Sequence, residues 1–99
     1  MVVEQGKNGD WNYRKWSNGM LEQWARLDQS NSATQHRFNG TYPIAFIEQP
    51  TLVASGGNYE NIDSGVRYCN ATATAYDVYV TATWPAGAYL NAYVIGKWK

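Results

Sequence analysis

The sequence is poor in several residue types that define common classes of protein. Its 99 residues include one cysteine, one histidine and three prolines. The single cysteine, Cys69, excludes an internal disulfide framework and fits assembly in a reducing cytoplasm. No apolar run approaches the roughly 20 residues of a membrane-spanning helix, and the opening MVVEQGKNGD contains no hydrophobic signal core. We therefore expect neither a disulfide scaffold nor membrane insertion.

Clustered charge is also lacking. The 8 Lys and Arg residues balance the 8 Asp and Glu residues, and the only dense positive group is Arg14 with Lys15. Because proteins bind phosphate backbones through clustered Lys and Arg, we expect no nucleic-acid partner.

The sequence shows no recognisable catalytic or metal-binding constellation. His36 follows a polar stretch, and neither a Ser-His-Asp set nor a glycine-rich phosphate loop is present. Three copies of His36 could meet on a three-fold axis, but no second metal ligand lies nearby. Asn58, Glu60, Asn61 and Asp63 carry oxygens that Ca²⁺ accepts, yet their spacing is not that of an EF-hand and a solvated turn is the default. We expect no enzyme activity, no cofactor and no metal.

What the chain does contain is aromatic side chains with a polar tip. Five Trp and eight Tyr stand against two Phe, a balance typical of interfaces and binding surfaces. No segment shows a sustained helical period, whereas β-branched and aromatic residues dominate between turn residues. The pattern predicts an all-β domain.

The dipeptide Asn18-Gly19 predicts a β-hairpin with a two-residue type I′ turn, since both residues tolerate positive φ. With these two residues as the loop, Lys15 would face Glu22 and Tyr13 would face Trp24. Opposite charges and paired aromatic rings both stabilise neighbouring strands, so this register is chemically reasonable.

The rest of the chain predicts further short strands, for a total of about seven in an antiparallel β-sandwich. We expect turns at Gln49-Pro50 and Asn70-Ala71, and a connector from an upstream region over residues 1–9, with residues 10–99 as a single domain. The strand over 89–98 has apolar residues on both faces, which places it centrally or against another subunit. The predicted inward-facing residues are Tyr42, Ile44, Phe46, Val66, Tyr68, Tyr76, Val78 and Val80. In the strand over 89–98, Leu90, Ala92, Val94 and Trp98 share one face, and Tyr89, Tyr93 and Ile95 share the other.

Three motifs together resemble the C-terminal domain of bacteriophage and prophage tail fibres. They are W-x-Y-R-K-W-S-N-G-x-x-E-Q-W at residues 11–24, T-Y-P-I-A-F at 41–46 and Y-V-I-G-K-W at 93–98. The resemblance implies a homotrimeric β-sandwich knob, made in the bacterial cytoplasm and carried at the distal tip of a virion's tail fibre. It implies contact with the host surface but transfers no binding residue by position.

Aromatic residues in predicted loops are the best candidates for receptor contact. Sugars present apolar faces that stack on Trp and Tyr, while Asn and Asp hydrogen-bond their hydroxyls. The candidates are Asn58, Tyr59, Asn61, Asp63, Trp84 and Tyr89, whereas Trp16, Tyr42, Tyr76 and Trp98 are expected to be structural. If strands run up and down, the loops at 28–34, 56–65 and 82–89 share the end where the N-terminus enters, forming the shoulder of the knob.

These expectations favour a non-enzymatic tip domain that binds a bacterial surface polysaccharide or protein. Two alternatives stay open on the sequence alone. One is a structural trimerisation or capping domain of the fibre end. The other is a monomeric carbohydrate-binding module of a cell-wall hydrolase.

Overall fold

A computed structural model describes residues 1–28, 37–57, 66–80 and 89–99 of the chain. Within these ranges it contains eight strands and no helix, so the predicted all-β class is confirmed. The strands are β1 Val2–Asn8, β2 Trp11–Trp16, β3 Met20–Asp28, β4 Arg37–Thr41, β5 Thr51–Gly57, β6 Val66–Ala71, β7 Ala75–Val80 and β8 Tyr89–Lys97.

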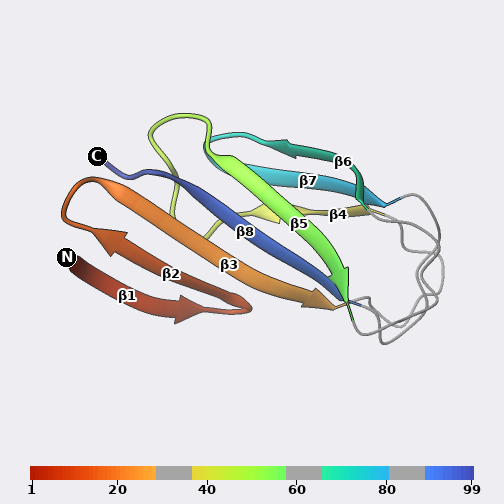
Figure 1. The fold of residues 1–99 in the computed structure, drawn as a ribbon, viewed down its shortest axis with the longest axis horizontal. Helices are drawn as coiled ribbons and strands as arrows, with labels where there is room; N and C mark the ends of the chain where they lie inside the picture. Colours follow the sequence, from red (N-terminus) through yellow and green to blue (C-terminus); the bar gives the residue numbers. More distant parts are fainter. Residues whose placement is uncertain (29–36, 58–65, 81–88) are drawn as a thin grey trace.

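The strands form two antiparallel sheets that face one another (Figure 1). The larger sheet has the order β1-β2-β3-β8-β5 and the smaller has the order β4-β7-β6. Buried side chains from both sheets pack into one core cluster, which comprises Trp11, Leu21, Ala25, Phe38, Tyr42, Phe46, Tyr76, Val78, Val80, Leu90, Ala92 and Val94. The predicted antiparallel architecture is confirmed.

Strand β8 lies between β3 and β5, which is the central position in the sheet that was one of its two predicted placements. Leu90, Ala92 and Val94 share one face, as their alternation predicts, and the structure shows that this face is buried in the core. The same alternation correctly predicts the buried residues of β7, Tyr76, Val78 and Val80.

The register predicted for the β2–β3 hairpin is wrong by one residue. Lys15 pairs with Leu21, and Arg14 pairs with Glu22. The N–H of Gly19 donates to the carbonyl of Trp16 at 3.0 Å, and Gly19 has φ +95°. This is a three-residue loop that ends in a left-handed glycine, a common alternative to the type I′ turn.

The slip moves Trp24 from the face of the sheet that carries Trp11 and Tyr13 to the opposite, outer face. It allows Leu21 and Ala25 to join Trp11 in the core, which the predicted register would have prevented. Burial of these apolar side chains therefore decides between two registers that the turn residues alone do not distinguish.

Residues 1–9, expected as a connector, contain the edge strand β1. A turn at Gly9, where φ is +63°, joins β1 to β2, and the two strands run antiparallel. At the start of β1, the carbonyl of Met1 accepts a hydrogen bond of 2.7 Å from the Ser17 N–H. The first residue therefore lies beside the hairpin turn, while a role of this segment as a link to an upstream region stays a prediction.

Two further expectations need correction. The turn expected at Asn70-Ala71 lies three residues later, at Ala73-Thr74, where the Thr72 N–H donates to the carbonyl of Ala75 at 2.8 Å. Tyr68, expected to face inward, is 48% exposed. The pairing of β6 with β7 shifts between Val66 and Tyr68, and such an irregularity reverses the simple alternation of faces.

The segment 42–46 is irregular, although it was expected to continue a strand. Tyr42 and Phe46 are nevertheless buried, as predicted, and Ile44 packs against the core. The Tyr42 N–H donates to Thr74 and the Phe46 N–H donates to Ala73, so the backbone is held by the β6–β7 turn instead of by a neighbouring strand.

Candidate functional site

Most of the predicted receptor residues lie outside the described part of the chain. These are Asn58, Tyr59, Asn61, Asp63 and Trp84, which fall within 58–65 and 81–88. The structure describes Tyr89, which begins β8 and pairs with Asp28 of β3 and Gly57 of β5. The guanidinium of Arg26 lies over the Tyr89 ring, 4.7 Å from its centroid.

The strand ends that border the three predicted loops lie at one end of the molecule (Figure 1). Asp28, Tyr89 and Gly57 form one rung of the larger sheet. In the smaller sheet, β4 begins and β7 ends near the pair Arg37 and Tyr79. The prediction that the loops are anchored at a common end is confirmed for these flanking strands.

The position of that end relative to the chain termini differs from the prediction. Because β1 reverses the chain before β2, the N-terminus lies at the hairpin end, together with the C-terminus (Figure 1). The anchored loop ends are therefore remote from both termini, and their expected placement on the shoulder beside the incoming chain is wrong.

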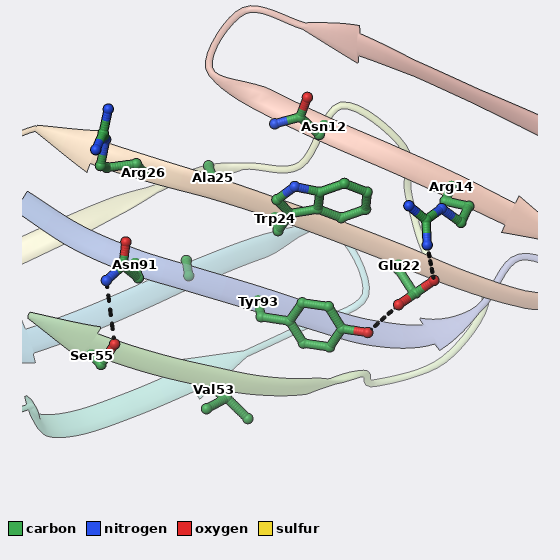
Figure 2. Close-up of a pocket in the computed structure, with 11 residues that line it drawn as sticks. Asn12, Arg14, Glu22, Trp24, Ala25, Arg26, Val53, Ser55, Asn91 and Tyr93 are labelled. Atoms are coloured by element: carbon green, nitrogen blue, oxygen red, sulfur yellow. Dashed lines mark hydrogen bonds and ion pairs between the residues drawn. The ribbon is translucent and has the colours of Figure 1, made fainter.

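The outer face of the larger sheet carries a shallow hollow of about 570 Å³ (Figure 2). We call it the sheet-face hollow. It is lined by Asn12, Arg14, Glu22, Trp24, Ala25, Arg26, Val53, Ser55, Asn91, Ala92 and Tyr93, which come from β2, β3, β5 and β8.

Two aromatic side chains occupy the centre of the sheet-face hollow. Trp24 and Tyr93 are cross-strand partners on β3 and β8, and both are half-buried. The guanidinium of Arg14 lies 5.3 Å from the ring centroid of Trp24 and 5.9 Å from that of Trp16. Contacts of a cation with aromatic faces stabilise such an arrangement and hold the rings in place.

At one end of the hollow, Glu22 accepts hydrogen bonds on both carboxylate oxygens. Oε1 accepts from the Trp16 indole at 2.6 Å, and Oε2 accepts from the Tyr93 hydroxyl. Arg14 Nη1 lies 3.8 Å from Oε1. Figure 2 shows this carboxylate between Arg14 and Tyr93.

The network around Glu22 alters the protonation of its members. Burial by itself would raise the pKa of Glu22, but the hydrogen bonds from Tyr93 and Trp16 and the charge of Arg14 lower it below its ordinary value. Burial and the hydrogen bond to Glu22 raise the pKa of Tyr93 to about 12. Near neutral pH the carboxylate is thus charged and the phenol is protonated.

The other end of the hollow is polar and open. Asn91 Nδ2 donates to Ser55 Oγ at 3.5 Å, and Arg26 and Asn91 are paired neighbours on β3 and β8. Arg26, Ser55 and Asn91 are exposed to solvent. This end therefore offers a guanidinium, an amide and a hydroxyl to a bound molecule.

Sequence reasoning missed the sheet-face hollow because the predicted hairpin register placed Trp24 on the same face as Trp11 and Tyr13. The alternation of β3 carries the missing information. Leu21 and Ala25 are apolar, whereas Glu22, Trp24 and Arg26 alternate with them and form a polar and aromatic face.

The aromatic residues expected to be structural largely hold the two sheets together. Tyr42 and Tyr76 are buried, and their ring centroids lie 5.8 and 5.4 Å from that of Trp11. Trp98 packs against the core, and its indole donates to the Trp16 carbonyl at 3.0 Å. Trp16 lies on the outer face, where it helps to hold Glu22.

Other kinds of site are not represented in the described ranges. Among residues 1–28, 37–57, 66–80 and 89–99, no group of three or more His, Cys, Asp or Glu side chains is placed to hold a metal ion. The same residues include no helix that is long and apolar enough to cross a membrane.

Comparison with known proteins gives matches in structure only. No protein-family model and no curated protein matches the sequence. The fold is similar to the C-terminal part of the P. aeruginosa R2 pyocin fibre, with a TM-score of 0.70 and 17% identity. That match covers 96% of this chain but 26% of the fibre chain, so the chain spans about a quarter of its length.

Two N-truncated pyocin tail fibres are also similar. The R1-type fibre matches with a TM-score of 0.68 and 14% identity, covering 95% of this chain and 86% of that chain. The R2-type fibre matches with a TM-score of 0.70 and 17% identity, covering 98% of this chain and 39% of that chain. The resemblance to tail-fibre C-terminal domains is thereby confirmed at the level of the fold.

Proposed function

We propose that this chain is the tip domain of a tail fibre of a phage or phage-tail-like particle. It acts without catalysis, as a homotrimer, and binds a polysaccharide or protein of the bacterial surface. The likeness of its fold to pyocin tail fibres supports the tail-fibre role.

The observation that carries the proposal is the separation of the chain termini from the loop-bearing end. Met1 lies beside the hairpin turn, where its ammonium group donates to Ser17 Oγ at 3.1 Å. The rung of Asp28, Tyr89 and Gly57 lies at the opposite end (Figure 1). A fibre shaft joined at Met1 would direct that rung away from the particle, toward the cell.

A homotrimer would also strengthen adsorption beyond what a single chain achieves. Three copies would triple the number of receptor contacts, so weak individual sites would combine into strong adsorption.

The proposal is tested by measuring adsorption of the fluorescently labelled chain to a panel of bacterial strains. We expect adsorption to some strains, and we expect the double variant Tyr59→Ala/Trp84→Ala to lose it while keeping its oligomeric mass. Ile47→Ala, at the hairpin end, is the matched control and should adsorb normally. Unchanged adsorption by the double variant would instead favour a capping domain that places the receptor site elsewhere.

Light scattering tests the oligomeric part of the proposal. A trimer should have about three times the chain mass of 11.2 kDa. A mass near that of the single chain would contradict the homotrimer and favour a monomeric carbohydrate-binding module.

A further inference from the structure

We infer that the sheet-face hollow binds an acidic saccharide, meaning a sugar that carries a carboxylate or phosphate group. The inference rests on the proposed function, because it names a class of bacterial surface glycan and a place where the domain would hold it. It assigns recognition to a sheet face as well as to the loops.

The hollow has the size and floor of a sugar site. Its volume of about 570 Å³ lies within the range of small-molecule sites in proteins. Trp24 and Tyr93 stand side by side at its centre, on paired positions of two neighbouring strands (Figure 2). Half-buried aromatic rings of this kind provide an apolar platform for the C–H face of a pyranose.

The polar groups of the hollow are suited to hydroxyl and anionic groups. Asn91 and Ser55 lie at one end and can each donate and accept hydrogen bonds. Glu22 is already matched, since Trp16 and Tyr93 donate to its oxygens and Arg14 lies close by.

The charge of the lining favours an anion. Two arginines and one glutamate line the hollow, so the lining carries one excess positive charge. Arg26 lies at the end opposite Glu22 (Figure 2). It is exposed, and its guanidinium lies over the ring of Tyr89. Its guanidinium can make paired hydrogen bonds with a carboxylate or phosphate.

The hollow is continuous with the loop-bearing end of the sheet. Arg26, Asn91 and Ser55 form one rung, which lies two residues before the rung that contains Tyr89. A saccharide on Trp24 could therefore extend toward Tyr89, the described member of the predicted receptor residues.

A second copy of the chain fits this surface less well. The cores of subunit interfaces are rich in arginine and aromatic residues but depleted of glutamate, and Glu22 lines the hollow together with the exposed polar side chains of Ser55 and Asn91. Among the lining residues, Val53 is the large apolar side chain that is exposed to solvent. The composition thus favours a polar ligand over a covered apolar contact.

The test uses NMR titration of the full chain with three sugars, one neutral and two acidic. Methyl β-D-glucuronide carries a carboxylate where methyl β-D-glucoside carries a hydroxymethyl group, and glucose 6-phosphate supplies the phosphate form. We expect both acidic probes to shift the indole N–H signal of Trp24 saturably. The neutral glucoside should bind about tenfold more weakly, because it lacks one charge-assisted hydrogen bond.

Variants separate the two parts of the site. Trp24→Ala should abolish binding of all three probes, and Arg26→Gln should reduce the acidic probes to the affinity of the neutral one. Lys97→Gln is the matched control, because it also removes an exposed cation from the larger sheet but does not line the hollow. Lys97→Gln should leave binding of all three probes unchanged. Because Arg26 is exposed, Arg26→Gln should keep the wild-type NMR signals of residues outside the hollow.

Several outcomes would overturn the inference. One is the absence of a shift in the Trp24 signal with either acidic probe, and another is equal affinity for the neutral glucoside. A third is a lower oligomeric mass for Trp24→Ala, because that result would identify a second copy of the chain as the occupant of the hollow. Adsorption to cells that persists without probe binding would overturn this inference and leave the fibre-tip proposal standing. A trimer that neither adsorbs nor binds the probes would overturn both.

Discussion

At the scale of single residues, Gln23 links the larger sheet to the irregular segment beside it. Its side chain is fully buried, and its amide donates to the Ile44 carbonyl at 2.8 Å and accepts from the Ile44 N–H at 3.1 Å. A buried amide that satisfies both backbone groups of another residue behaves like one rung of a sheet. It therefore fixes how segment 42–46 covers the core.

We predict that Gln23→Ala lowers the free energy of unfolding by about 2 to 4 kcal/mol, since it leaves a cavity and two unpaired backbone groups. Urea denaturation measures the change. Gln23→Leu restores most of the volume but neither hydrogen bond, so it should recover only part of the loss. Gln5→Ala, on exposed β1, is the control, and a loss as large as that of Gln23→Ala would contradict the assignment.

A second residue-scale prediction concerns acid stability. The lowered pKa of Glu22 means that the folded state binds its proton less readily than the unfolded state. Glu22 therefore contributes stability above its unfolded pKa, and the contribution is lost as pH falls through the lowered folded pKa. Glu22→Gln should reduce the fall in melting temperature between about pH 6 and pH 2. An unchanged slope would contradict this role of Glu22.

The alkaline limb should respond to Tyr93 in the opposite sense. Its pKa is raised from 10.0 to about 12, so the stability it contributes is fully present below its unfolded pKa and is lost as pH rises through about 12. Tyr93→Phe cannot ionise and should flatten the decline in melting temperature at alkaline pH. Tyr79→Phe, on the smaller sheet, serves as the control.

At the scale of elements, the β2–β3 hairpin shows how much depends on one residue of register. In the observed register Arg14 is opposite Glu22, while Lys15 lies 3.7 Å from Glu4 of β1. The alternative register would pair Lys15 with Glu22. The two registers thus bring different charges together.

We predict a coupling energy of about 0.3 to 1 kcal/mol between Arg14 and Glu22, as is typical of cross-strand ion pairs. A double-mutant cycle with Arg14→Gln and Glu22→Gln, followed by urea denaturation, measures it. The same cycle on Lys15 and Glu22 should give a coupling near zero. A larger coupling energy for Lys15 and Glu22 than for Arg14 and Glu22 would contradict the observed register and favour the one with a two-residue turn.

The turn that sets this register is sensitive to a side chain at Gly19. A Cβ there would lie 2.8 Å from the Lys99 carbonyl oxygen, in addition to the strain of positive φ. Gly19→Ala should therefore cost about 2 to 3 kcal/mol of stability, compared with about 1 kcal/mol for Gly9→Ala, where the space is open. Equal melting temperatures for the two variants would show that the C-terminal residues do not restrict the turn.

At the scale of the whole molecule, both termini lie at the hairpin end. The Trp98 N–H donates to the Gly19 carbonyl at 2.9 Å, so the last residues close the end at which Met1 also lies. Partners attached at either terminus would project away from the loop-bearing end.

We predict that fusion of a folded carrier protein to either terminus leaves adsorption to cells unchanged. The carrier would occupy the hairpin end, remote from Tyr89 and from the rung of Arg26. Adsorption of the two fusions and of the free chain can be compared by flow cytometry. Loss of adsorption in both fusions, with oligomeric mass retained, would show that the receptor contacts the hairpin end.

The sequence by itself determined the features that follow from local alternation. The two-residue period gives the buried residues of β7 and groups Leu90, Ala92 and Val94 on one face of β8. The two-sided apolarity of β8 predicts either a central position, which it has, or contact with another subunit. The order of turns and loops predicts a common end for the loop-bearing strands. Each of these features depends on a short stretch of sequence in which the order of apolar, polar and turn residues is sufficient to predict it.

Only the tertiary structure decided the hairpin register, the pairing of β1 and the sheet-face hollow. Asn18-Gly19 is compatible with loops of two or three residues, and the choice comes from burying Leu21 and Ala25 in the core. That choice places Trp24 on the outer face beside Tyr93, 69 positions later in the chain. A contact between such distant residues depends on strand pairing across the whole domain, which the alternation within one strand does not contain.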